Sequence, residues 1–253
     1  MIFYFSATGN SKYVANQLAE DGEQIIFIPD VVDHGIYTFM IESDEKVGII
    51  SPTYSWTLPS IVEDFLKKLK LQYTNRPYLY YVGTFGTTTG AAAAKANYIM
   101  KAKGLKFDAM FDVKMPDTWT PFFDLSNKQR IEEINMQAEI QINRVKNDIR
   151  RKVKGKHMHV TTPSFTGVIG KSIYDHQMRR TDHFTVEDGC IGCGLCARKC
   201  PVHAIEIVNK RPVWIKGKCT MCLGCLHRCP KFAIQYGKNT KKHGQYTNPH
   251  VKV

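Results

Sequence analysis

All eight cysteines of this 253-residue chain lie near its C-terminal end, in two copies of one spacing. Each copy reads Cys-x2-Cys-x2-Cys-x3-Cys-Pro. Three thiolates separated by two residues each can bind three corners of a [4Fe–4S] cube, and the fourth, set apart by three residues and a proline, reaches a second cube. The spacing therefore indicates two redox centres that each pass single electrons.

The two ligand sets are expected to cross between the motifs. The first cluster would be held by Cys190, Cys193, Cys196 and Cys229. The second would be held by Cys219, Cys222, Cys225 and Cys200. Small and apolar residues between the ligands let backbone N–H groups approach the sulfides and keep water away. His203 and His227 lie nearby, where a histidine either couples a proton to the electron or has a structural role.

Residues 184–237 resemble the bacterial-type two-cluster ferredoxins, including the Pro-x-x-Ala-Ile that begins at Pro201 and again at Pro230. The resemblance implies a small α+β domain that carries both clusters. Zinc ribbons bind one metal with two Cys-x2-Cys pairs and have no role for the third cysteine or the Cys-Pro. Disulfides between neighbouring cysteines of this spacing would be strained, and nothing in the sequence indicates export.

A second site is indicated at the start of the chain, where an apolar run over residues 1–5 precedes an expected helix to about Glu20. The loop between them is built from Ser6, Ala7, Thr8, Gly9, Asn10 and Ser11. A buried strand that leads into such a loop at a helix N-terminus forms a phosphate site, because hydroxyls and free N–H groups point at one anion. The loop has no lysine or arginine, so the helix dipole would supply the positive potential. The same residues would also serve as an ordinary helix cap.

The loop lacks the Gly-Lys-Ser/Thr of the P-loop and the G-x-G-x-x-G of dinucleotide-binding folds. It resembles the FMN-phosphate loop of flavodoxins, Ser/Thr-x-Thr-Gly-x-Ser/Thr, at every defining position. This resemblance implies FMN as a cofactor and a flavodoxin-like, doubly wound parallel sheet of the α/β class.

Two further segments have the order strand, loop and helix, with strands expected over residues 46–51 and 77–83. Ligands of open parallel sheets bind beyond the carboxyl ends of the strands, and flavodoxin-like proteins hold the isoalloxazine ring between these two loops. The resemblance therefore implies ring contacts from Pro52, Thr53, Tyr54, Ser55, Trp56, Thr84, Phe85, Gly86 and Gly90. We expect Tyr54 or Trp56 to stack on the ring, with core packing as the alternative for either aromatic.

The rest of the amino-terminal part has one more expected strand, over residues 105–113, and a long helix over 126–152. Trp119 lies in the loop between them. It would cover the flavin as a lid or act as a local hydrophobic anchor. Ser126 is the expected cap at the start of the helix.

The chain is expected to form two domains joined by a connection. Residues 1–155 would form the FMN domain, 156–183 the connection, 184–237 the cluster domain and 238–253 a frayed basic tail. The cluster domain is too small to fold without its inorganic centres. No apolar run approaches the length of a membrane span and no signal peptide is visible, so the cytoplasm is the expected location.

The formal net charge of +12 is concentrated in residues 184–253, which hold 12 Lys+Arg and 3 Asp+Glu. Each cluster and the FMN phosphate would contribute about −2, which leaves about +6. A positive cluster domain would attract an acidic redox protein of the ferredoxin or flavodoxin type. No motif that reads RNA or DNA accompanies the basic residues, so nucleic acid is not the expected partner.

The order of the two parts resembles the fused flavodoxin–ferredoxin proteins of anaerobic bacteria and archaea, which implies electron transfer. Cubane clusters pass single electrons and FMN takes one or two, so we expect a one-to-two-electron converter for a protein partner. One alternative is an FMN-dependent reductase of a small molecule, such as a quinone or nitro compound. Another is a binding module whose clusters are only structural. No acid, base or nucleophile has a placement that identifies a substrate.

Overall fold

The computed structural model describes residues 1–158 and 165–253. Within these residues, six parallel strands form the central sheet in the order β2-β1-β4-β6-β7-β8. Their bounds are β1 Ile2–Tyr4, β2 Ile25–Phe27, β4 Lys46–Pro52, β6 Tyr78–Phe85, β7 Ala109–Lys114 and β8 Gly155–His157. Without β8, this is the 2-1-3-4-5 order of flavodoxin-like sheets. The expected fold class is confirmed.

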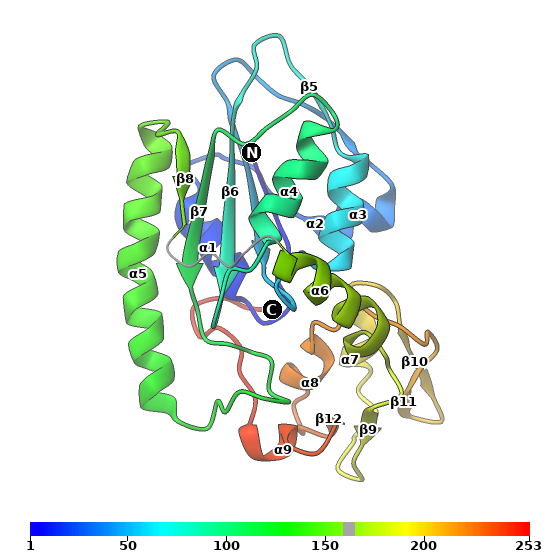
Figure 1. The fold of residues 1–253 in the computed structure, drawn as a ribbon. Helices are drawn as coiled ribbons and strands as arrows, with labels where there is room; N and C mark the ends of the chain where they lie inside the picture. The colour runs from blue at the N-terminus through cyan, green and yellow to red at the C-terminus, as the bar shows by residue number, and fades with distance from the viewer. Residues whose placement is uncertain (159–164) are drawn as a thin grey trace.

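Helices cover both faces of the sheet (Figure 1). One face packs against α1 (Asn10–Leu18) and α5 (Lys128–Arg150). The other packs against α2 (Ile28–His34), α3 (Ser60–Lys68) and α4 (Ala92–Lys101). Burial on both faces explains why β6 is apolar or aromatic at nearly every position and is buried throughout. A separate parallel pair, β3 (Thr38–Met40) and β5 (Lys70–Gln72), lies outside this sheet.

The C-terminal part is a small α+β unit, as expected. It consists of two antiparallel strand pairs and two short helices: β9 (Phe184–Val186) with β12 (Ile234–Tyr236), β10 (Ile205–Val208) with β11 (Arg211–Trp214), α7 (Leu195–Arg198) and α8 (Gly224–His227). The carboxyl ends of β6 and β7 point toward this unit (Figure 1). The edge of the sheet where ligands bind therefore faces the cysteine motifs.

The expected cap of the long helix is wrong by one residue. Asn127 is the cap, and its Oδ1 accepts a hydrogen bond of 3.0 Å from the Arg130 N–H. Ser126 lies in the preceding loop, where its N–H donates to Asp124. Neither α5 nor any other helix in the described parts of the chain is long and apolar enough to cross a membrane.

The connection contains regular secondary structure. Residues 155–157 form β8, which pairs with β7 and extends the sheet into the segment. After residues 159–164, which include Pro163 and lie outside the described residues, come α6 (Phe165–Ile173) and a π-helix (Tyr174–Met178). Tyr174 is fully buried and forms hydrogen bonds to both parts of the molecule. Isolated buried residues of this kind leave no helical periodicity, so the sequence did not reveal the helices.

The expectation of a frayed tail over residues 238–253 is wrong. The tail begins with α9 (Thr240–His243) and then runs along the amino-terminal domain. Tyr246 is 6% exposed and Asn248 2% exposed. Specific hydrogen bonds and the packing of Val251 against the core hold this segment in place, and a polar composition alone could not predict these contacts.

Candidate functional site

A cavity of about 730 Å³ lies at the carboxyl edge of the sheet. Its walls are the loops that follow β1, β4, β6 and β7, together with residues of the π-helix and of the second cysteine motif. Every residue predicted to contact FMN lines this cavity except Gly9 and Gly90. Cofactor sites typically enclose about 300–1,000 Å³, so the cavity has a suitable size.

The loop after β1 presents donors at the start of α1. Gly9 has a left-handed φ of 99° and its N–H donates to Ser6 Oγ over 3.1 Å. Ser11 Oγ lies 2.8 Å from Thr84 Oγ1, which joins the first loop to the third. Among residues 1–158 and 165–253, no side chain caps the first turn of α1, so its N–H groups are left to bind an anion. These features fit the phosphate of FMN.

The two loops predicted to hold the flavin ring touch each other. Tyr54 and Thr57 exchange two backbone hydrogen bonds of 2.9 Å around Ser55 and Trp56, which both have positive φ. A Cβ on Gly90 would lie 2.4 Å from the Trp56 Cα, so only glycine allows this approach. Gly90 therefore allows the two loops to approach each other closely, and it does not line the cavity.

The two candidate stacking residues differ in their surroundings. Tyr54 packs between the core of the sheet and the core of the cluster unit, with its ring centroid 6.3 Å from Phe5 and 6.5 Å from Tyr174. Burial raises the pKa of Tyr54 well above its usual value, so the phenol is neutral. Trp56 is 39% exposed at the rim of the cavity. Both side chains line the cavity, and which one stacks on the ring stays a prediction.

Trp119 lies between the cavity and the cluster unit. It lines the cavity, and its ring lies 5.8 Å from that of Tyr236 in the core of the cluster unit. His227 also joins the cluster unit to the loop that carries Trp119, because its Nε2 donates to Thr118 O. Its Nδ1 accepts from the Tyr246 N–H. Burial lowers the pKa of His227 to about 4, so the ring is neutral. Its two nitrogens are both engaged, which indicates a structural role.

The structure brings the cysteines together in the crossed sets. One small cavity is lined by Cys190, Cys193, Cys196 and Cys229, and a second by Cys200, Cys219, Cys222 and Cys225. Backbone N–H groups of Met221, Ala204 and Ala233 donate to cysteine sulfurs over 3.2–3.3 Å. Such donors stabilise thiolates, so both cavities fit [4Fe–4S] clusters.

The two cysteine cavities differ in exposure. Cys193 in the first is exposed, and the neighbouring Ile191 is 59% exposed. Cys219 in the second is buried, and burial raises its pKa to about 12. Cys222 lines the second cysteine cavity and also the large cavity. The second ligand set therefore lies against the predicted flavin site, and the first faces solvent.

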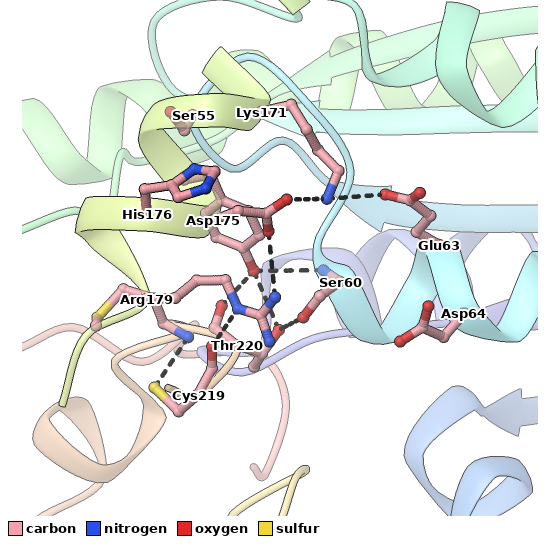
Figure 2. Close-up of polar contacts among 12 residues, drawn as sticks. Ser55, Ser60, Glu63, Asp64, Lys171, Asp175, His176, Arg179, Cys219 and Thr220 are labelled. Carbon is pink, nitrogen blue, oxygen red and sulfur yellow. Dashed lines mark hydrogen bonds and ion pairs between the residues drawn. The ribbon is translucent and has the colours of Figure 1, made fainter. Parts of the chain in front are cut away.

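A polar network anchors the second motif to α3 (Figure 2). The Tyr174 hydroxyl donates to Thr220 O over 2.6 Å and accepts from the Ser60 N–H. Arg179 Nε donates to Cys219 O over 2.7 Å, so the residue that follows the π-helix holds a predicted cluster ligand directly.

The network continues from Arg179 through Asp175 to Lys171, which also pairs with Glu63 of α3. The sequence alone did not reveal these residues. The spacing of Lys171, Asp175 and Arg179 at four-residue intervals, which places charges on one helix face, was the available signal.

The comparisons with known proteins match two separate stretches of the chain. The flavodoxin domain family matches residues 1–143, and the 4Fe-4S dicluster domain family matches residues 184–230. Among curated proteins, one subunit of an ion-translocating oxidoreductase complex from Methanosarcina acetivorans is 41% identical over 49 residues, which are 19% of each chain. An uncharacterized protein of Methanocaldococcus jannaschii is 41% identical over 59 residues, 22% of each chain. The match thus spans about a fifth of these relatives.

Two solved structures are similar to part of this chain. The Trp repressor binding protein of Bacillus subtilis has 11% identity and a TM-score of 0.34, covering 56% of this chain and 97% of that one. The rubredoxin oxygen:oxidoreductase of the anaerobe Desulfovibrio gigas has 17% identity and a TM-score of 0.31, covering 58% and 36%. From the family matches, the chain belongs to the flavodoxin domain family, in a fused flavodoxin–ferredoxin arrangement whose general role is electron transfer.

Proposed function

We propose that this chain transfers electrons between two [4Fe–4S] clusters and FMN on behalf of a protein redox partner. FMN exchanges one or two electrons and each cubane exchanges one, so together they supply one-to-two-electron conversion. We assign residues 1–155 to the flavin domain, 156–183 to the connection and 184–237 to the cluster domain.

The observation that carries this proposal is the position of Cys222. It lines the large cavity and the second cysteine cavity at once. Electron transfer requires that redox centres approach each other closely, and a shared wall provides that approach. Tyr174 is fully buried beside this wall and the partly buried Tyr54 packs next to it, so their rings would limit water there and lower the local dielectric.

Different loops of the chain would bind the phosphate, the flavin ring and the clusters. Ser6, Thr8, Asn10 and Ser11, with the free N–H groups of α1, would hold the phosphate. The loops with Tyr54 and Trp56 and with Thr84, Phe85 and Gly86 would hold the ring, and Trp119 would close the side toward the clusters. The crossed cysteine sets would hold the clusters.

We propose that the partner is an acidic redox protein that docks at the first cluster site. This site is the more exposed of the two, through Cys193 and Ile191. Lys231 lines its cavity, and Lys210 lies beside Gly192 at the tip of the β10–β11 hairpin. Both lysines are exposed and form no ion pair with any residue of segments 1–158 and 165–253. Two unpaired cations beside an exposed site favour an acidic surface.

A second candidate function is reduction of a small molecule, such as a quinone or nitro compound, at the flavin. It is supported by the rim of the large cavity, where Phe122 is 77% exposed and Trp56 39% exposed. These aromatic side chains would offer an apolar entrance to an aromatic substrate.

Anaerobic purification followed by spectroscopic titration separates the two functions. We expect about eight irons and one FMN per chain, and bleaching of the flavin when reduced ferredoxin is added. Rapid turnover of NADH with a quinone would instead support the reductase. Protein that contains iron but no flavin would contradict both.

A further inference from the structure

The last residues of the chain cover the loop that we assign to the FMN phosphate. Residues 245–253, here called the C-terminal strap, leave the cluster unit after α9 and run toward the start of α1 (Figure 1). At the near end, Gln245 Nε2 donates to Leu226 O and Cys229 O, and the Tyr246 N–H donates to His227. The strap is therefore fixed to α8 and to a predicted cluster ligand.

At its far end the strap contacts the loop in atomic detail. The Asn248 N–H donates to Thr8 O over 2.7 Å. The Tyr246 hydroxyl donates to Asn10 Oδ1 over 2.9 Å, and Asn248 Nδ2 donates to the same oxygen over 3.2 Å. The Asn248 side chain also lies so close to Gly9 that a Cβ there would be 2.8 Å from its Cβ. The loop is thus packed on its outer side.

These contacts determine which way the Asn10 amide points. Its oxygen accepts two hydrogen bonds from the strap, so the oxygen faces the strap and the NH2 group faces the opposite way. One N–H of that group donates to Pro116 O over 3.2 Å, and the second is available at the cavity that Asn10 lines. The strap also draws the Thr8 carbonyl toward itself. The strap therefore leaves an Asn10 N–H facing the cavity and directs the Thr8 carbonyl oxygen away from it.

We propose that the C-terminal strap completes the FMN phosphate site, with Tyr246 and Asn248 as positioning residues that act through Asn10 and Thr8. This inference rests on the proposed assignment of the phosphate to the loop of residues 6–11. An anion binds to N–H donors and is repelled by carbonyl oxygens, so an Asn10 amide of fixed orientation favours the phosphate. Riboflavin shares the ribityl and ring portions of FMN but lacks the phosphate, so its binding would not gain from this effect.

The test uses the full chain with its clusters and compares two flavins. The protein is equilibrated without oxygen in a mixture of FMN and riboflavin, which lacks the phosphate, and the ratio of the two bound flavins is measured after separation. Asn248→Ala and Tyr246→Phe are each expected to lower the bound FMN:riboflavin ratio by about threefold to tenfold, because each removes one hydrogen bond to Asn10. Iron content per chain reports whether the cluster unit is intact.

Lys252→Ala is the matched control, because Lys252 is exposed and the variant keeps its backbone carbonyl, which accepts from Lys12. It should keep the wild-type ratio. Asn248→Asp provides a second readout, because a carboxylate cannot donate to Asn10 Oδ1. The Asn10 amide should then reverse its orientation, and the bound FMN:riboflavin ratio should fall further than in Asn248→Ala. Variants that keep their iron and the wild-type ratio would overturn the role of the strap. Wild-type protein that binds neither flavin would overturn the proposed function itself.

Discussion

The Tyr246 hydroxyl donates a hydrogen bond to Asn10 Oδ1, 236 residues earlier in the chain. Burial raises the pKa of Tyr246 well above its usual value, so the hydroxyl remains a donor at any physiological pH. The bond joins the two ends of the polypeptide across the boundary between the flavodoxin-like sheet and the cluster unit. The phosphate loop and the cluster ligands are thereby parts of one connected structure.

This connection predicts that removing iron weakens FMN binding. The strap is held by carbonyls of Leu226 and Cys229, which lie in and beside α8. A cluster domain of this size unfolds when its metal is removed, and the strap would then leave Asn10. Anaerobic treatment with a chelator should raise the dissociation constant of FMN by about tenfold, since two hydrogen bonds are lost. The fluorescence of released FMN measures this change. An iron-free chain that keeps the affinity of the holoprotein would contradict the connection.

The exposed lysines beside the first cysteine cavity predict a salt-dependent encounter with an acidic partner. In the variant Lys210→Glu/Lys231→Glu, reduction by a reduced acidic ferredoxin should slow by about tenfold at low ionic strength, because steering charges are reversed. The difference should shrink at high salt. Stopped-flow absorbance of the flavin measures the rate.

The matched control for this pair is Lys106→Glu/Arg144→Glu, which changes the net charge equally. Both residues are exposed, and they lie beyond α4 and on α5, in the amino-terminal domain. The control should slow the reaction far less. Equal slowing by the two pairs would mean that overall charge, rather than docking at the first cluster site, sets the rate. Dithionite, a small reductant, should reduce all three proteins alike.

Sequence alone predicted what depends on local spacing. The cysteine sets follow from residues three or four positions apart, and the cavity loops follow from the rule that ligands bind after parallel strands. The strap and the π-helix network could not be found in this way. Asn248 and Asn10 make one contact at very long separation, and a single polar contact leaves no periodic pattern. The cap at Asn127 instead of Ser126 shows that neighbouring polar residues are equivalent until backbone geometry distinguishes them.

The bond from Arg179, the residue that follows the π-helix, to Cys219 O predicts that Arg179 stabilises the second cluster site. Arg179→Ala removes a charge-assisted hydrogen bond of 2.7 Å and leaves Asp175 with one cation fewer. We expect the loss of about 2 kcal/mol in the stability of the cluster domain, as is typical of hydrogen bonds to charged groups. The urea concentration at which cluster absorbance disappears measures the change under anaerobic conditions.

Arg179→Lys tests whether charge or geometry is responsible. Lysine keeps the positive charge near Asp175 but cannot reproduce the planar guanidinium that bonds Asp175 and Cys219 together. It should therefore restore only part of the stability. Full recovery would assign the effect to charge alone, and no loss in either variant would contradict the anchoring role.

The carboxylate of Glu63 predicts that the stability of the contact between α3 and α6 depends on pH. Burial alone would raise the pKa of Glu63, but the hydrogen bond from Lys67 and the charges of Lys171 and Lys95 outweigh it and hold the pKa below 4.5. The unfolded chain therefore takes up a proton at a higher pH than the folded chain does. The stabilisation is complete above about pH 6 and is lost as the pH falls below 4.5.

Glu63→Gln should accordingly destabilise the protein by about 2 kcal/mol at pH 7, and the difference from wild type should narrow below pH 4.5. Urea unfolding followed by the helical circular dichroism signal at several pH values measures it. Asp64→Asn is the matched control, because Asp64 is 64% exposed and lies 3.6 Å from Lys67. Exposed pairs contribute less than about 1 kcal/mol, so this variant should remain near wild type. A Glu63→Gln difference that stays constant down to pH 3 would show that packing, and not the ionised carboxylate, stabilises the contact between α3 and α6.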